Sequence, residues 1–140
     1  MAFYDTMTDL ELMIQVIWLE ARGEGESGMR AVGHVIKNRV GFPSFPKTLR
    51  NVLTQTNAFS CLLPNDPEYG KKPDADDPQN LFCAYIAPKI LDGSDPDLTN
   101  GAHFYINAAT ATSPWFLNHI VGDKINHPLL ATIGRQNFYK

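Results

Sequence analysis

Apolar residues recur every three or four positions near the start of the chain, which predicts an amphipathic helix with one buried stripe. The stripe consists of Leu10, Met13, Ile14, Ile17, Trp18 and Ala21. Thr8 and Glu11 have the spacing of a capping box, in which each side chain binds the backbone N–H of the other residue, so the helix is predicted to begin there. Gly23 and Gly25 then predict a stop or a bend.

The rest of the chain alternates between helical periodicity and turn-rich stretches, with two aromatic and β-branched runs near its end. In chain order we expect a helix from Ser27 to Val40, a short helix from Thr48 to Gln55, a surface loop over 63–80, a helix that opens at Asp77-Pro78 and is kinked or ended by Pro88, a strand over 101–106, a short helix or turn from Ser113, and a strand over 133–139. Gly33 in the second helix would permit close helix packing. The fold class is therefore α+β, a mainly helical single domain over residues 1–140 with a small antiparallel β-sheet.

Glu20 occupies a position where a charged residue is unexpected. It lies three residues after Ile17 and seven after Met13, so it points along the apolar stripe. Partial burial there would raise the pKa of its carboxyl and favour the protonated acid. Cleavage of a glycosidic bond needs such a group, because the leaving oxygen must be protonated as the bond breaks. The alternative is that the helix ends early and Glu20 pairs with a lysine or arginine at the surface.

Glu24 would be a neighbour of Glu20 if the helix continued through Gly23, and its charge would raise the pKa of Glu20 further. The favoured alternative is that the glycines turn Glu24 away, where it is solvated or lies at the start of the next helix. Arg22 projects away from Glu20 on a helix and is expected to brace the bend.

Composition and charge exclude several classes of function. The twelve lysines and arginines are scattered and the formal net charge is −3, so nucleic acid is not an expected partner. No run of about 18 apolar residues is present, so no membrane insertion is expected. The histidines and cysteines lack metal-binding spacings, and no metal is expected. Cys61 and Cys83 are interpreted as reduced thiols, with a single bridge between them as the open alternative.

A set of spaced segments carries a resemblance to a known family. The segments are Trp18-Leu-Glu-Ala-Arg-Gly-Glu24, Gly28, Ala31-Val32, Asn38-Arg39-Val40, Phe45-Pro46, Val52, Phe59-Ser60-Cys61, Gly101-Ala-His-Phe-Tyr105, Ser113-Pro-Trp115 and Ile133-Gly-Arg-Gln-Asn-Phe-Tyr139. Together they resemble the SleB-type cell-wall hydrolases, a family named for a spore cortex-lytic enzyme. The resemblance implies a fold like that of lysozyme and the lytic transglycosylases, and cleavage of bacterial peptidoglycan between N-acetylmuramic acid and N-acetylglucosamine without a cofactor. It also implies that Glu20, the first glutamate of E-A-R-G-E, is catalytic.

The resemblance places the segment that holds His103 and Tyr105 in a substrate groove, and on a strand these two side chains face the same side. The candidate substrate-binding residues are Glu24, Ser60, His103, Tyr105 and Trp115. A histidine satisfied by a backbone carbonyl and a tryptophan in the core fit the same pattern, so these structural interpretations stay open. Ala58 departs from the family, which usually has glutamine there, and Asn57 is the nearest possible substitute. That departure concerns sugar preference and leaves the central carboxylate untouched.

The N-terminal residues have neither the positive nor the apolar region of a secretory signal. A bare catalytic domain of this kind resembles a phage endolysin more than a spore enzyme. We therefore expect a monomer that is made in the cytoplasm without a signal peptide and acts on the cell wall after phage-dependent or lysis-dependent release.

Three other functions remain as alternatives. A hydrolytic muramidase would use water where a lytic transglycosylase uses the muramyl 6-hydroxyl, and the transglycosylase is favoured because one carboxyl can serve as acid and then as base. A peptidoglycan amidase or peptidase would use Cys61 or Cys83 with His103. A non-catalytic cell-wall-binding module is the third.

Overall fold

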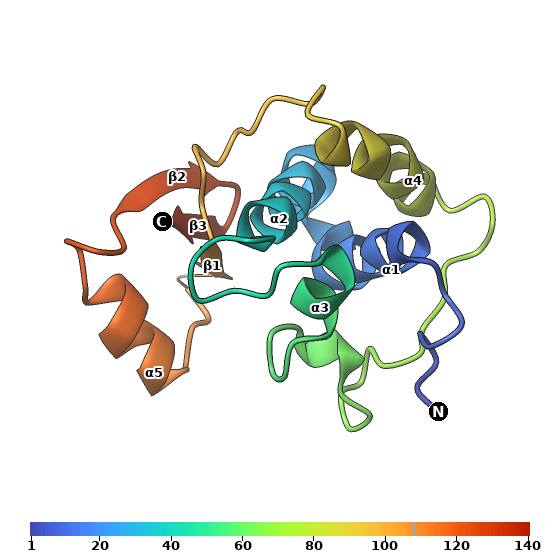
Figure 1. The fold of residues 1–140 in the computed structure, drawn as a ribbon, viewed down its shortest axis with the longest axis horizontal. Helices are drawn as coiled ribbons and strands as arrows, with labels where there is room; N and C mark the ends of the chain where they lie inside the picture. The colour runs from blue at the N-terminus through green and yellow to red at the C-terminus, as the bar shows by residue number, and fades with distance from the viewer. Residues whose placement is uncertain (108) are drawn as a thin grey trace.

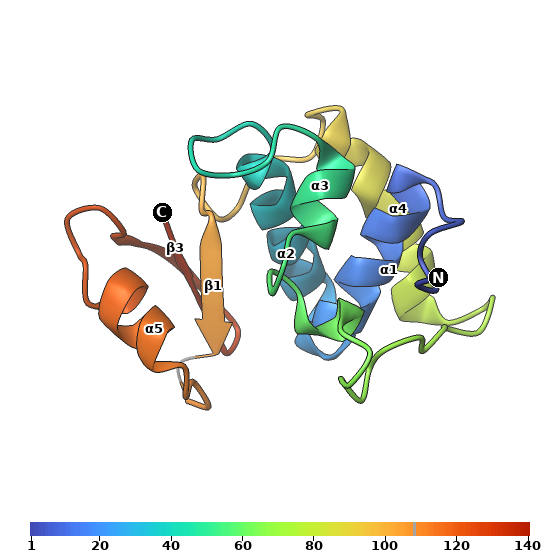
Figure 2. The same ribbon diagram turned by 60° about the horizontal axis from the view of Figure 1, so that its bottom comes forward.

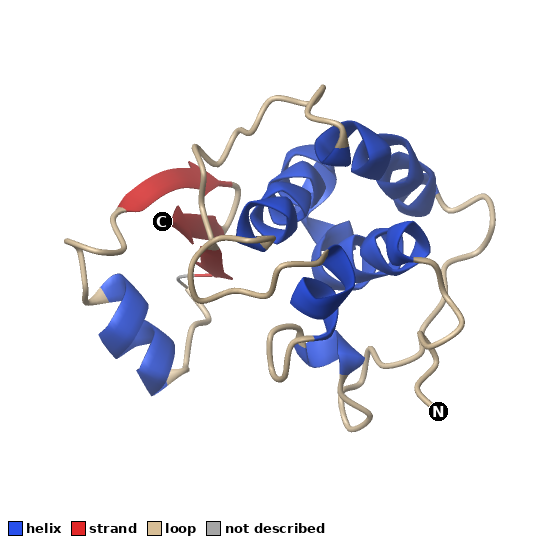
Figure 3. Cartoon of the chain, in the orientation of Figure 1, coloured by secondary structure: helices blue, strands red, loops and turns tan. Residues whose placement is uncertain are grey.

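The computed structural model describes residues 1–107 and 109–140. Figure 1 shows helices α1 to α4 gathered on one side of the molecule, and the sheet with α5 on the other; Figure 3 separates helix from strand by colour. In chain order the elements are α1 (Asp9–Ala21), the 3₁₀ turn η1 (Arg22–Glu24), α2 (Gly25–Arg39), α3 (Leu49–Thr54), the 3₁₀ turn η2 (Ser60–Leu62), α4 (Pro78–Leu91), β1 (Phe104–Asn107), α5 (Pro114–Phe116), the π-helical turn η3 (Leu117–Val121), β2 (Leu129–Ile133) and β3 (Gln136–Tyr139). The predicted α+β class, mainly helical with a small antiparallel sheet, is confirmed.

The first helix begins at the predicted capping box. The backbone N–H of Glu11 donates to Thr8 Oγ1 at 3.1 Å, and the backbone N–H of Thr8 donates to Glu11 Oε1 at 2.8 Å. The predicted apolar stripe was too narrow, because α1 is covered by α2, α3 and α4 and is buried on most of its surface. Leu12 and Val16, which lie off the stripe, are fully buried, whereas Leu10 is 37% exposed.

The close helix packing predicted at Gly33 is present between α2 and α4. A Cβ at this position would lie 2.6 Å from Ile90 Cδ1, closer than carbon atoms can approach, so any larger residue would force the side chain of Ile90 to move. The resulting core contains the fully buried residues Leu12, Met13, Val16, Ile17, Val32, Ile36, Val52, Leu53, Cys83, Ala87 and Ile90.

The fourth helix begins as predicted, since Asp77 Oδ1 accepts the backbone N–H of Asn80 at 2.9 Å and Pro78 occupies the first turn. Pro88 does not end it, because the helix continues to Leu91. A proline inside a helix removes one backbone hydrogen bond and crowds the preceding turn. Burial of Ala87 and Ile90, on either side of Pro88, against the other helices opposes that cost.

The sheet has three antiparallel strands in the order β1-β3-β2. The prediction of one strand over 133–139 was wrong: Ile133 ends β2, Gly134 and Arg135 form the turn, and β3 begins at Gln136. Gly134 has a φ of 59°, a backbone conformation typical of such turns and favourable for glycine. Strand β2 was not anticipated. The pairing of the two predicted runs, which form β1 and β3, was anticipated.

Helix α2 joins the two sides of the molecule. Ala31 and Val35 on α2 pack against Ala102 and the fully buried Phe138 of β3, which form a second hydrophobic cluster. Figure 2 shows β1 beside α2, and the two elements are in contact. Ser113 caps α5 as expected, with Oγ accepting the backbone N–H of Phe116 at 3.3 Å. Within the described residues, no helix is long and apolar enough to cross a membrane.

Candidate active site

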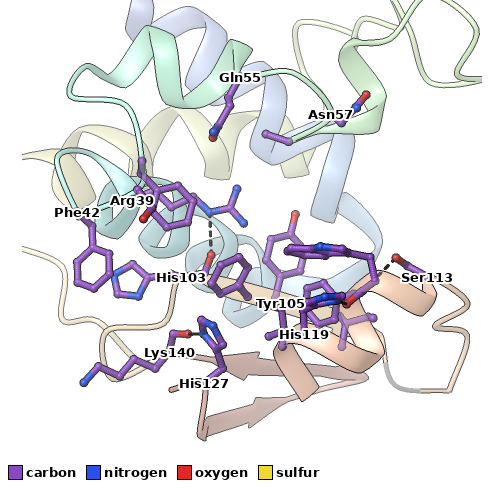
Figure 4. Close-up of a pocket in the computed structure, with 18 of the residues that line it drawn as sticks. Arg39, Phe42, Gln55, Asn57, His103, Tyr105, Ser113, His119, His127 and Lys140 are labelled. Carbon is purple, nitrogen blue, oxygen red and sulfur yellow. Dashed lines mark hydrogen bonds between the residues drawn. The ribbon is translucent and has the colours of Figure 1, made fainter. Parts of the chain in front are cut away.

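A cleft of about 1110 Å³ lies between the helices and the sheet. It is lined by the end of α1, the end of α2 with the following turn, the segment after α3, strand β1, and the α5–η3 region. Figure 4 shows Gln55 and Asn57 on one side of this cleft, His119 and Ser113 on the opposite side, and Arg39 between them.

Glu20 lies in the last turn of α1 and lines the cleft. Its side chain is half-buried, and Tyr105 Oη donates to Glu20 Oε1 at 3.3 Å. Burial raises the pKa of the Glu20 carboxyl above its ordinary value of 4.5; the hydrogen bond from Tyr105 opposes this rise, Asp66 adds to it, and Arg39 opposes it. The expectation from the helix position, a partly desolvated acid with a raised pKa, is confirmed.

Among the cleft-lining residues of the described chain, Glu20 is the only carboxylate. Glu24 does not line the cleft; its carboxylate binds Arg135 of the β2–β3 turn, with Oε1 at 2.7 Å from Nη2. The bend at the glycines turns Glu24 away, as the favoured alternative predicted. The structure therefore does not bring Glu24 to the substrate-binding position suggested for it.

Arg22 braces this bend as expected. Its guanidinium donates to the carbonyl of Leu19 at 3.3 Å and pairs with Glu68 at 2.6 Å, while its plane lies 4.3 Å from the ring of Trp18. These contacts hold the end of α1 against the loop that follows η2, and so they help to fix the direction in which Glu20 projects.

Tyr105 and His103 both line the cleft. Phe104, which the predicted alternation turned to the opposite face, lines it as well, so alternation along the strand does not account for their placement. Burial raises the pKa of Tyr105 well above 10, so its hydroxyl keeps its proton and acts as a donor to Glu20. His103 is 5% exposed and its ring stacks on Phe42 at 3.8 Å. Burial, followed by the charge of Arg39, lowers the pKa of His103, which favours the neutral ring. Within the described structure its Nδ1 has no hydrogen-bond partner, so the backbone-satisfied interpretation does not hold for this atom.

Ser60 and Trp115 also line the cleft, together with Ala58 and Asn57. Trp115 is 57% exposed and stacks on His119 at 5.3 Å, so it does not belong to the core. Asn57 lies beside Ala58 with a φ of 61° and an exposed side chain, which leaves its amide free to act where the family usually has glutamine.

Sequence reasoning did not single out several other cleft residues. They are Arg39, Phe42, Phe45, Gln55, His119 and His127. Arg39 was noticed only as part of the Asn38-Arg39-Val40 segment. It lies three residues after Ile36 and seven after Val32, so helical periodicity placed it along the apolar face of α2, and this signal of burial was overlooked. Its burial, at 8% exposed, arises from rings that are distant in sequence.

No group of three or more histidine, cysteine or acidic side chains that could hold a metal ion occurs among residues 1–107 and 109–140. The chemistry available in the cleft is therefore described by one acid of raised pKa, the tyrosine that binds it, a buried guanidinium and polar and aromatic surfaces suited to sugar rings.

A family model described as a cell wall hydrolase matches residues 23–139 of the chain. The chain belongs to the cell wall hydrolase family. It is 36% identical over 107 residues to a spore cortex-lytic enzyme of Halalkalibacterium halodurans, covering 76% of this chain and 29% of that protein. It is 32% identical over 135 residues to a spore cortex-lytic enzyme of Bacillus cereus, covering 96% of this chain and 45% of that protein. This cell wall hydrolase thus spans less than half the length of these curated relatives.

The fold of this cell wall hydrolase is also similar to a solved structure, the catalytic domain of the germination-specific lytic transglycosylase SleB from Bacillus anthracis. The TM-score is 0.72 at 30% sequence identity, and the match covers 94% of this chain and 93% of that one. The predicted resemblance to the SleB-type hydrolases is therefore confirmed at the level of sequence and of fold.

The geometry opposes the cysteine mechanism that the sequence left open. Cys61 and Cys83 are free thiols, 2% and 0% exposed respectively. Burial raises the pKa of Cys83 to about 12 and that of Cys61 further still, whereas a nucleophilic thiol needs a lowered pKa. Neither residue lines the cleft that contains His103.

Alkylation of the native cell wall hydrolase should therefore leave its activity unchanged. Iodoacetamide reacts with the thiolate, which is scarce at both buried cysteines near pH 8. Wall-clearing activity and adduct mass measured after treatment check this prediction, with guanidinium-unfolded protein as the positive control for two adducts. Inactivation that keeps pace with the modification of Cys61 would contradict it.

Tyr105→Phe should lower the rate of wall cleavage roughly tenfold, because a hydrogen bond to a charged group typically contributes about 1.5–3 kcal/mol and this one is long. The hydrogen bond lowers the pKa of Glu20, so its loss should raise that pKa. If Glu20 is the acid that the resemblance implies, the alkaline limb of the pH–rate profile should move to higher pH. An alkaline limb that stays in place would show that Tyr105 does not act through Glu20.

Proposed function

We propose that this cell wall hydrolase is a lytic transglycosylase, which cleaves peptidoglycan strands between N-acetylmuramic acid and N-acetylglucosamine. The observation that carries the proposal is that Glu20 is the one acidic side chain of the cleft within residues 1–107 and 109–140, held in a half-buried position that favours its protonated form. Inverting and retaining hydrolases generally use a pair of carboxyl groups, one of them to activate water or to attack the sugar. A transglycosylase can complete its cycle with one.

In the first step Glu20 donates its proton to the glycosidic oxygen as the bond from C1 of the muramyl ring to that oxygen breaks. The N-acetylglucosamine end leaves with a hydroxyl group, positive charge develops at C1, and Glu20 becomes a carboxylate. Tyr105 Oη can then donate to this carboxylate, which stabilises the charge that forms during the step.

In the second step the muramyl 6-hydroxyl oxygen attacks C1, and the Glu20 carboxylate accepts the hydroxyl proton. The product is a 1,6-anhydromuramyl end, and Glu20 returns to its protonated form without consuming water. The half-buried site supports both halves of this cycle, because a carboxyl with a raised pKa is a usable acid when protonated and a stronger base when ionised.

The similarity to spore cortex-lytic enzymes and to the SleB catalytic domain, whose name describes a lytic transglycosylase, supports the same reaction here. Peptidoglycan is accordingly the proposed substrate. Service as a phage endolysin, the monomeric state and release through lysis remain predictions that expression in a host with a holin and sedimentation analysis would test.

Mass spectrometry of the muropeptides released from purified wall tests the proposal. We expect products that end in 1,6-anhydromuramic acid, 18 Da lighter than the corresponding reducing ends since no water is added. Products that all carry reducing ends would favour the hydrolytic muramidase instead. Intact wall that binds the protein without release of fragments would favour a binding module.

A further inference from the structure

Arg39 is a buried cation whose hydrogen bonding is incomplete. It lies at the end of α2, and its Nε donates to the carbonyl of His103 at 2.8 Å. Within the described residues its guanidinium forms no other hydrogen bond and no ion pair. That single contact accounts for Nε and for the attachment of β1 to α2, and it leaves both Nη groups unused.

The surroundings of the guanidinium make this arrangement costly. The rings of Phe45, Phe59 and Phe104 lie 5.2, 5.5 and 5.6 Å from Cζ, so aromatic faces replace most of the water around the charge. Cation–π contacts return part of the lost hydration. A buried charge with no ion-pair partner and with unused donors is nevertheless expensive to keep, and such groups concentrate at functional sites.

The unused donors are open to the cleft. The buried polar atoms without a partner in the described structure are His103 Nδ1 and Gln136 Oε1, so the Nη atoms of Arg39 are not sealed beneath other side chains. Arg39 lines the same cleft as Glu20, and its charge acts on the Glu20 carboxyl. Figure 4 shows Arg39 reaching from α2 toward the centre of the cleft, with its Nε bond to His103.

We propose that Arg39 binds the carbonyl oxygen of the substrate acetamido group next to the scissile bond, with Phe45 and Phe104, which line the cleft, forming the apolar surroundings of that contact. This inference rests on the proposed function. The acetamido group is attached to C2, one carbon from the C1 atom whose bond Glu20 protonates, so a group close to Glu20 is placed to meet it. Its carbonyl oxygen matches the Nη donors, and its methyl group matches an aromatic environment.

The peptide stem offers a different acceptor, a carboxylate, which we consider less suited to this place. The stem is carried on the lactyl group at C3 and its carboxylates lie several bonds farther from C1. A second full charge would also have to lose its water to enter the aromatic surroundings of Arg39, whereas a neutral amide loses much less. The cleft near Arg39 is therefore expected to select for an amide.

The test compares three soluble tetrasaccharide–peptide fragments: the native fragment, the fragment after de-N-acetylation, and the fragment after removal of its peptide stems. Binding is measured by calorimetry with Glu20→Gln protein, which should not cleave them, and with the same protein carrying Arg39→Gln. De-N-acetylation removes the carbonyl and leaves an ammonium that Arg39 repels. We expect it to weaken binding about tenfold or more, the scale of one hydrogen bond to a charged group, when Arg39 is present.

In the Arg39→Gln protein the affinities for the native and the de-N-acetylated fragment should differ by no more than about threefold. Chemical re-acetylation regenerates the native fragment and should restore the affinity lost with the protein that retains Arg39. Removal of the peptide stems should change the affinity of both proteins for the fragment by the same factor. A merely structural role would weaken all three fragments alike and would keep the acetyl ratio unchanged, which overturns the proposal.

An Arg39-dependent effect of stem removal, without an Arg39-dependent effect of de-N-acetylation, would also overturn it in favour of a stem carboxylate. If Arg39→Gln fails to fold, Arg39→Lys and the three-fragment comparison with Arg39 intact still decide, because equal affinity for native and de-N-acetylated fragments contradicts the inference. Failure of the proposed function has a separate signature: the wild-type protein would release no fragments from wall and the Glu20→Gln protein would bind none.

Discussion

Glu20→Gln should abolish wall cleavage while the protein stays folded. The substitution keeps size and hydrogen-bonding capacity near Tyr105 but removes the proton that the leaving oxygen requires. General acid–base groups contribute about 10² to 10⁴ in rate, and loss of the one acidic side chain found among the described residues of the cleft should reach or exceed the upper end of that range. Turbidity clearance and muropeptide release measure the effect. A variant that retains more than about a tenth of the wild-type rate would contradict the catalytic assignment.

Glu24→Gln is the matched control, since Glu24 lies in the same E-A-R-G-E segment and pairs with Arg135 outside the cleft. Loss of a partly exposed ion pair typically costs about 0.2–1 kcal/mol of stability and should leave measurable activity. A Glu24→Gln protein as inactive as Glu20→Gln would show that the assay reports damage to the segment rather than loss of the acid.

The same pair of variants carries a stability prediction. The pKa of Glu20 is raised in the folded protein, so the folded state holds the proton more tightly than the unfolded state does. Stability is lost as pH rises from the ordinary value of 4.5 through the raised one, and the cost is complete above that window. Glu20→Gln should therefore melt at or above the wild-type temperature near pH 7, and at about the same temperature near pH 4.

Phe138→Ala should cause the largest loss of stability among single substitutions in the sheet. Phe138 is fully buried on the central strand β3, packs on Ala31, Val35 and Ala102, and lies 5.8 Å from the ring of Tyr105. Truncation of a buried phenylalanine to alanine typically costs about 3–5 kcal/mol, because the cavity closes only in part. The melting temperature should fall by about 10 °C or more, as measured by calorimetry or circular dichroism.

Ile125→Ala serves as the comparison, since Ile125 is 92% exposed and its truncation removes little buried surface. Its effect should stay within about 0.5 kcal/mol. Loss of less than about 1 kcal/mol in Phe138→Ala would mean that the cluster joining α2 to the sheet does not hold the two sides together.

Features that depend on neighbouring residues in sequence were predicted well. The capping box at Thr8, the cap at Asp77 and the helix start at Ser113 each follow from side chains that satisfy backbone donors three residues away. The direction of Glu20 followed from helical periodicity, and His103 and Tyr105 line the cleft in which the resemblance placed their segment.

Features that depend on distant packing were predicted poorly. The local rule that proline ends a helix was overridden at Pro88 by burial of its neighbours against other helices. Gly134 and Arg135 were predicted to belong to one strand. The turn that they form is defined only by the pairing of Ile133 with Gln136 across it. Helix α1 is buried beyond its apolar stripe because α2, α3 and α4 all pack on it. The sequence of α1 alone does not show how many helices will cover it.

For this protein the sequence by itself determined the family, the helical character and the identity of Glu20 as an acid in an apolar setting, since each rests on local spacing. The tertiary structure decided which other groups meet that acid. Tyr105 reaches it from a strand 85 residues away, Glu24 turns aside although it lies only four residues from it, and Arg39 is buried by rings from three separate segments. Burial and charge at one point depend on every element that packs there, and no single stretch of sequence contains that information.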